Sequence, residues 1–144
     1  MVSSTAATLH LHLLGDLELR RGEGLPLALP PSRRTRALLG YLVATGVPQS
    51  RSALCDLLWD GSDDPRASLR WSLTKLRPVV DDATAPRLHA DRDKVAFAAS
   101  RCEIDSLQVG ELLLHALQLG VVSVQVFSHF CRARRVPQQG LILL

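Results

Sequence analysis

The fold is decided by one stretch, Asp64-Pro65-Arg66-Ala67-Ser68-Leu69-Arg70-Trp71-Ser72-Leu73-Thr74-Lys75-Leu76-Arg77, which has the start signal and apolar periodicity of an amphipathic helix. Asp64 can accept hydrogen bonds from the free N–H groups of a first helical turn. Pro65 suits the first helical position because it has no N–H to leave unpaired. Apolar residues recur at i, i+4 and i+7 and form one stripe that must pack against other elements: Leu69, Leu73 and Leu76.

The opposite side of this predicted helix carries Trp71, with Ala67 and Thr74 beside it, at about 100° of rotation per residue. Residues 65–77 contain four basic residues and no acid. Arg70 and Lys75 flank the outer face, and Arg66 and Arg77 lie nearer the edge of the core. One interpretation is an ordinary solvated helix with a cationic face. The exposed indole favours a binding helix instead, because an exposed Trp usually finds an apolar or stacking partner.

Two more helices are predicted before this stretch, each preceded by a serine cap. Ser32 precedes a helix over residues 33–45, which ends at the Gly46-Val47-Pro48 turn. Ser50 precedes a helix over residues 51–59. The residues expected in the core are Leu38, Leu39, Leu42 and Val43 from the first helix and Leu54, Leu57, Leu58 and Trp59 from the second. We expect Pro78 to end or kink the third helix near Arg77.

Short extended segments are predicted on both sides of the helices. Residues 9–14, 16–20 and 25–29 are separated by glycine-containing turns, which predicts a small antiparallel sheet. Residues 87–90 and 94–98 flank Asp91-Arg92-Asp93, which predicts a β-hairpin with a cation at its tip. The predicted class is α+β, a winged helix-turn-helix with an N-terminal antiparallel sheet and a C-terminal β-hairpin wing. In that arrangement the third helix leaves its outer face free for the major groove of DNA.

The composition limits the class of protein. A chain of 144 residues with 47% apolar residues suffices for one domain with a short appendage. The net charge of +3 permits nucleic-acid binding without demanding it. Three cysteines, Cys55, Cys102 and Cys131, lack metal-ligand spacing and predict reduced thiols in a cytoplasmic protein. Polar residues interrupt the apolar segment 112–130, and the N-terminus has no basic start, so neither a membrane span nor a signal peptide is expected.

Several residue pairs have the chemistry of a site but no complete set of partners. His10 and His12 share one strand face without a third ligand nearby in the sequence, which favours a solvated face over a metal site. Two pairs could be interpreted as catalytic but lack further partners: His89 with Asp91, and Cys55 with Asp56. We therefore expect no enzyme activity, no cofactor and no metal.

Six blocks in order resemble the N-terminal OmpR-type winged helix of SARP-like bacterial transcriptional regulators: LLGDLEL (13–19), RALLGYL (36–42), LLWD (57–60), ASLR (67–70), LTKLR (73–77) and ADRDKV (90–95). We expect a disordered stretch at residues 1–8 and the winged-helix domain at residues 9–105. Relatives of this family continue into a long helical activator domain. Residues 106–144 are too few for it, so we expect an incomplete domain or a tail produced by truncation or a frameshift.

The resemblance implies that the third helix recognises double-stranded DNA. Base contacts would come from Arg70, Trp71, Thr74 and Lys75. Backbone contacts would come from Arg33, Arg34, Arg66 and Arg77, and the wing would place Arg92 and Lys94 on the minor groove or its phosphates. The loop with Asp60, Asp63 and Asp64 would face RNA polymerase, unless it is only a solvated loop with a helix cap. Relatives also bind direct-repeat sites as two copies.

The expected function is therefore sequence-specific DNA binding and transcriptional regulation, as an activator, in the cytoplasm and nucleoid. The alternative is a protein–protein interaction module that uses Trp71 and the apolar tail, because interaction hot spots also combine Trp and Arg. Arg33 and Arg34 keep two interpretations as well. At a helix start they either contact phosphate or are exposed arginines that tolerate a small dipole penalty.

Overall fold

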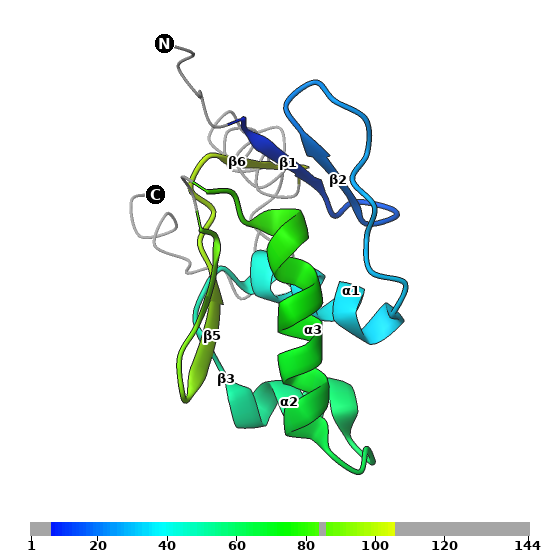
Figure 1. Ribbon diagram of the computed structural model, residues 1–144, viewed down its shortest axis with the longest axis vertical. Helices are drawn as coiled ribbons and strands as arrows, with labels where there is room; N and C mark the ends of the chain where they lie inside the picture. Colours follow the sequence, from blue (N-terminus) through cyan, green and yellow to red (C-terminus); the bar gives the residue numbers. More distant parts are fainter. Residues whose placement is uncertain (1–6, 84–85, 106–144) are drawn as a thin grey trace, which may run out of the picture.

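The computed structural model describes residues 7–83 and 86–105, and within these ranges it contains three helices and two three-stranded sheets (Figure 1). The architecture is mixed α+β. The expectations for residues 1–6 and 106–144, which include the activator-domain remnant and the apolar segment 112–130, lie outside the described residues. None of the helices in the described part combines the length and apolar character that crossing a bilayer requires.

The three helices start at the predicted caps. They are α1 (Arg33–Thr45), α2 (Arg51–Trp59) and α3 (Pro65–Val80). In each, the side chain of the cap accepts a hydrogen bond from the backbone N–H of the third helical residue, at 2.9 to 3.3 Å. The caps are Ser32, Ser50 and Asp64. Gly46 ends α1 with a φ of 63°, a left-handed conformation that suits glycine.

The helix α3 does not end near Arg77, so the predicted stop was wrong. It continues through Pro78 to Val80. Pro78 removes one hydrogen bond from the last turn, but it is exposed, so water can reach the carbonyl that it leaves free. Val80 is fully buried, and the N–H of Asp81 donates to the carbonyl of Arg77 at 2.9 Å. Burial and the final cap offset the local cost of the proline.

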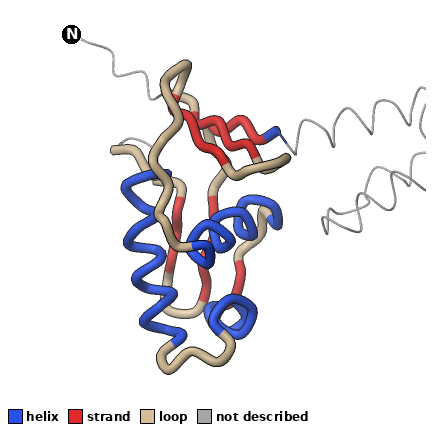
Figure 2. Tube along the Cα trace, turned by 90° about the vertical axis from the view of Figure 1, so that its right-hand side faces the viewer, coloured by secondary structure: helices blue, strands red, loops and turns tan. Residues whose placement is uncertain are grey.

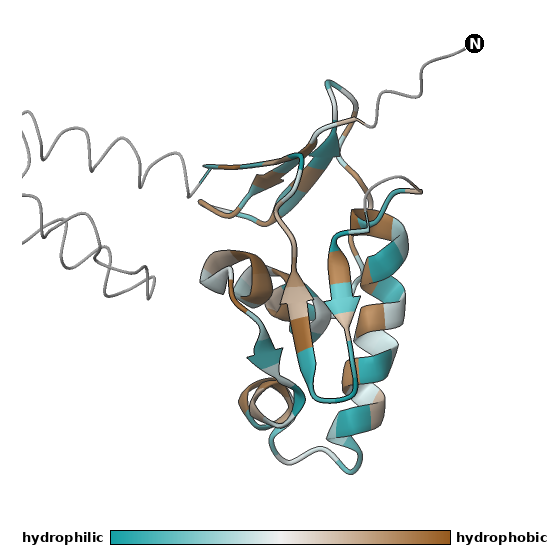
Figure 3. Cartoon of the chain, turned by 90° about the vertical axis from the view of Figure 1, so that its left-hand side faces the viewer, coloured by the Kyte–Doolittle hydropathy of each residue, from teal (hydrophilic) through white to brown (hydrophobic). Residues whose placement is uncertain are grey.

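The helices pack around one hydrophobic core, and Figure 3 shows an apolar and a polar side on α3. The apolar stripe predicted for α3 is buried, as are all four apolar positions predicted for α1: Leu38, Leu39, Leu42 and Val43. In α2, Leu54 and Trp59 are buried and Leu58 is half-buried. Leu57 is 55% exposed, so its predicted burial was wrong. It lies about 200° around the helix from the buried Cys55 and therefore faces away from the core.

The first sheet has the order β2-β1-β6, formed by β1 (Leu9–His12), β2 (Glu18–Arg21) and β6 (Cys102–Ile104). β1 pairs with β2 antiparallel but with β6 parallel. The predicted antiparallel pairing of the first two segments is confirmed, but the third strand predicted at residues 25–29 was wrong, and β6 takes its place in the sheet. That segment forms only an isolated bridge, Arg20 to Pro26, because Pro26 has no N–H to extend a ladder. Figure 2 shows this sheet at one end of the molecule.

The second sheet has the order β3-β5-β4, formed by β3 (Gln49–Ser50), β4 (Leu88–Ala90) and β5 (Lys94–Phe97). β4 and β5 are antiparallel and are joined by the turn Asp91-Arg92-Asp93. The Asp91 carboxylate accepts hydrogen bonds from the N–H groups of Asp93 and Lys94, both at 2.7 Å. The short strand β3 was not predicted, and it joins the residues immediately before α2 to β5.

Candidate nucleic-acid interface

In the view of Figure 1, α3 lies between α1 and β5, and its outer face is the side turned away from the buried Leu69, Leu73 and Leu76. Trp71 is 49% exposed on this face, although tryptophan side chains in folded proteins are on average largely buried. The Nζ atom of Lys75 lies 5.5 Å from the centroid of the Trp71 ring, which is within cation–π distance. Arg70 and Thr74 are also exposed, and the Thr74 hydroxyl donates to the Arg70 carbonyl at 3.0 Å. The four residues predicted to contact bases are therefore all exposed along one helix.

A cluster of guanidinium groups lies beside the first half of α3. Four arginines line one open pocket of about 570 Å³, and we call them the basic cluster: Arg51, Arg66, Arg70 and Arg92. They come from three elements, since Arg51 begins α2, Arg66 and Arg70 belong to α3, and Arg92 lies in the β4–β5 turn. Two carboxylates, Asp64 and Asp93, line the same pocket. The structure thus brings together three predicted DNA-contacting residues and one that was not predicted.

Arg51 is held in this cluster by the β4–β5 turn. Its Nε atom donates to the carbonyl of Asp91, and its backbone N–H donates to the carbonyl of Asp93, both at 2.8 Å. The sequence gives no local signal for this arrangement, because Arg51 simply follows the Ser50 cap. Its proximity to Arg92 depends on the pairing of β3 with β5, which joins segments more than forty residues apart.

In the part of the chain that the structure describes, no ion pair neutralises the guanidinium groups of the basic cluster. Among the described residues, the ion pairs do not include Arg51, Arg66, Arg70 or Arg92. Asp64 instead accepts the capping hydrogen bond of α3. Burial raises the pKa of the neighbouring Cys55 thiol, and among the nearby charges Arg66 and Arg51 lower it whereas Asp56 and Asp64 raise it. Such a patch attracts an anion.

The other side of α3 is joined to the first turn of α1. The hydroxyl groups of Thr35 and Ser72 form a buried hydrogen bond of 2.9 Å. Arg33 and Arg34 directly precede Thr35 in this first turn, and both are exposed. The bond therefore holds the first turn of α1, which carries these two arginines, against α3.

Two predicted contacts lie apart from the basic cluster. Arg77 is engaged within the protein, since its Nη1 atom donates to the carbonyl of Leu88 at 3.2 Å and lies 3.7 Å from Asp81 Oδ2. Lys94 lines a separate pocket with Arg77 and His89. In the acidic loop, Asp64 serves as the cap of α3, and Asp60 and Asp63 are exposed.

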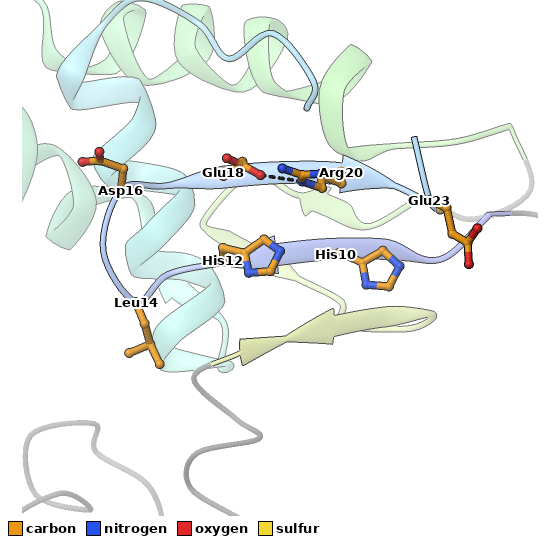
Figure 4. Close-up of a pocket in the computed structure, with 8 residues that line it drawn as sticks. His10, His12, Leu14, Asp16, Glu18, Arg20 and Glu23 are labelled. Carbon is orange, nitrogen blue, oxygen red and sulfur yellow. Dashed lines mark hydrogen bonds and ion pairs between the residues drawn. The ribbon is translucent and has the colours of Figure 1, made fainter. Parts of the chain in front are cut away.

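The two histidines of β1 lie on the open face of the first sheet (Figure 4), and more than fifty residues of sequence separate them from α3. His10 Nδ1 is 3.1 Å from Glu103 Oε2, and His12 Nδ1 is 3.8 Å from Asp105 Oδ2. The parallel pairing of β1 with β6 brings these acids close, which the sequence pattern did not indicate. Among the residues placed by the structure, no group of three or more His, Cys, Asp or Glu side chains could hold a metal ion.

No protein-family model matches the chain, and no curated protein matches it significantly.

Proposed function

We propose that this chain binds double-stranded DNA sequence-specifically and regulates transcription, as a winged helix with α3 in the major groove. The observation that carries the proposal is the basic cluster: four guanidinium groups from three elements, without ion-pair partners in the described part of the chain, beside an exposed Trp. Convergence of cations from separate elements on one helix face is the electrostatic pattern of a nucleic-acid interface.

In this proposal the parts of the face have different roles. Arg70, Thr74 and Lys75 are exposed along α3 and carry the hydrogen-bonding groups that read base edges. Arg51 and Arg66 line the same pocket as Arg70, near the start of α3, and contact phosphates. The β4–β5 turn acts as the wing and brings Arg92 to the flanking backbone. Arg33 and Arg34 contact the backbone on the α1 side.

The order of elements supports the winged-helix assignment. Three helices are followed by an antiparallel pair of strands whose turn lies beside the first turns of α3. A three-stranded sheet, closed by the short β3, supports that turn. By resemblance to SARP-like regulators, the proposal extends to activation, to two copies on direct-repeat sites, and to RNA polymerase as the partner of the exposed Asp60 and Asp63.

The test begins with selection of bound sequences from random duplex DNA, followed by affinity measurements at several salt concentrations. Arg70→Ala should lose about 1–3 kcal/mol and relax the preference at one base position. Arg51→Gln should weaken binding to all sequences similarly and reduce the slope of log K against log salt by about 1. Arg20→Gln is the matched control, because Arg20 pairs with Glu18 on the first sheet. Unchanged affinity for both Arg70→Ala and Lys75→Ala would refute the placement of α3.

The exposure of Trp71 supports a second candidate, a module that binds another protein. A buried indole at the centre of a protein interface is a typical hot spot. In a Trp59→Phe variant, Trp71 is the only remaining tryptophan, so its fluorescence reports on the partner directly. A change on adding selected duplex DNA supports the first proposal, and a change only on adding a partner protein supports the second.

A further inference from the structure

An apolar pocket lies beside Trp71, where the segment that leads from β2 to α1 passes α3. Its volume is about 360 Å³, and we call it the Trp71 notch. Its lining is Ala28, Leu29, Pro30, Pro31, Trp71, Lys75 and Val79. Lys75 is the one ionisable residue of this lining. The notch therefore differs from the basic cluster, which is polar and is lined by residues on the other side of α3.

The walls of the notch are held in place before any ligand arrives. Pro30 is buried, and Pro30 and Pro31 have φ angles fixed by their rings. Val79 packs against the hydrophobic core. Lys75 lies close to the Trp71 ring, at the cation–π distance given above. A preformed apolar pocket loses little conformational freedom when it is filled.

The charges around the notch indicate the kind of ligand that fills it. Lys75 stands in its lining, and Arg33 and Arg34 follow Pro31 after a single serine. A ligand that matches this surface presents a small apolar group close to negative charge. In the major groove of DNA, the 5-methyl group of thymine is apolar and is flanked by the phosphate backbone.

We infer that the Trp71 notch holds the 5-methyl group of a thymine, which makes Trp71 a specificity-determining residue for one A·T pair. This inference rests on the proposed DNA-binding function and goes beyond it, because it names the chemical group that is read. Burial of one methyl group contributes about 0.8 kcal/mol, which corresponds to roughly fourfold in affinity.

The test uses the full chain and a duplex selected from random DNA, in which each thymine is replaced in turn by deoxyuridine. Deoxyuridine keeps the pairing and the O4 acceptor and lacks only the methyl group. We expect one substitution to weaken binding about fourfold for the wild-type chain and to have no effect on Trp71→Ala. Leu57→Ala is the matched control, because Leu57 is a similarly exposed apolar residue outside the notch and should keep the fourfold response. Leu29→Ala should reduce it.

Three results would overturn the inference while leaving DNA binding intact. The first is that all deoxyuridine duplexes bind as tightly as the parent duplex. The second is that the response persists in Trp71→Ala, so that the methyl group is read elsewhere. The third is that Trp71→Ala binds the parent duplex with unchanged affinity, as expected if a partner protein covers the notch. Failure to select any duplex would instead refute the proposed function, and the inference with it.

Discussion

The buried hydrogen bond between Thr35 and Ser72 should fix the position of α1 against α3, and a double-mutant cycle can measure its strength. Thr35 is 0% exposed and Ser72 is 1% exposed, so water cannot replace either partner. Thr35→Val keeps the shape of the side chain but leaves the Ser72 hydroxyl buried without this partner. Ser72→Ala likewise leaves the Thr35 hydroxyl buried without this partner. Each single change should lower the free energy of unfolding by about 1–3 kcal/mol.

The double variant should lose less than the sum of the two single losses. Replacing both hydroxyl groups by apolar groups removes the unsatisfied partner together with the bond, so little desolvation cost remains. Because the double variant should lose little, the expected coupling between the two sites is at least as large as one single loss, about 1–3 kcal/mol. Because α1 carries Arg33 and Arg34, the single variants should also weaken DNA binding if the two helices shift relative to each other.

Urea unfolding of the four proteins, followed by tryptophan fluorescence, to which the buried Trp59 contributes, gives all the free energies under one condition. The unfolding slopes must agree among the four for the comparison to hold. Strictly additive losses would refute the reasoning, because they would mean that neither hydroxyl depends on the other. A single loss below about 0.5 kcal/mol would also refute it, since that is the range of ordinary surface substitutions.

Three further predictions test the fold at separate places. Arg87 is 1% exposed and donates to the carbonyls of Val80, Ser100 and Arg101. Arg87→Met should therefore lower the free energy of unfolding in urea by about 3 kcal/mol or more. The control Arg92→Met changes an exposed arginine and should lower it by less than about 0.5 kcal/mol. Gly40→Ala should stabilise α1 by about 0.5–1 kcal/mol because its Cβ would contact nothing, whereas Gly46→Ala should cost about 1 because of the positive φ. Two backbone N–H donors hold the pKa of Asp91 below its usual 3.8, so the turn should gain stability from this carboxylate above that pH and lose it progressively on further acidification. An NMR titration checks the pKa, and Asp91→Asn should remove this pH dependence.

The sequence predicted the helices well because the signals that start a helix are local. Ser32, Ser50 and Asp64 each cap the helix that was expected to follow them, and the apolar stripe of α3 is buried. The exposure of Trp71 followed from the same periodicity. In each case the deciding interaction joins residues within one or two turns, so the pattern of letters contains the necessary information.

Contacts between distant segments were not predictable in this way. β6 pairs with β1 across about ninety residues of sequence, and no local pattern indicates whether such a strand runs parallel or antiparallel. The basic cluster has the same origin. Arg51 joins Arg66 and Arg92 only because β3 pairs with β5, and a two-residue strand has no recognisable periodicity. The sequence therefore predicted most members of the candidate site but not the arginine that connects them.

The prolines of residues 25–31 explain both an error and the candidate specificity pocket. The alternating pattern suggested a third strand, but Pro26 stops the ladder after one bridge, and Leu27 adds a single bond from its N–H to the Leu19 carbonyl, at 2.7 Å. A segment that cannot join the edge of a sheet must bury its apolar side chains against another element. It does so by crossing to α3, where Leu29, Pro30 and Pro31 form a wall of the Trp71 notch. The same residues that exclude a strand thus place an apolar surface beside the helix proposed to read DNA.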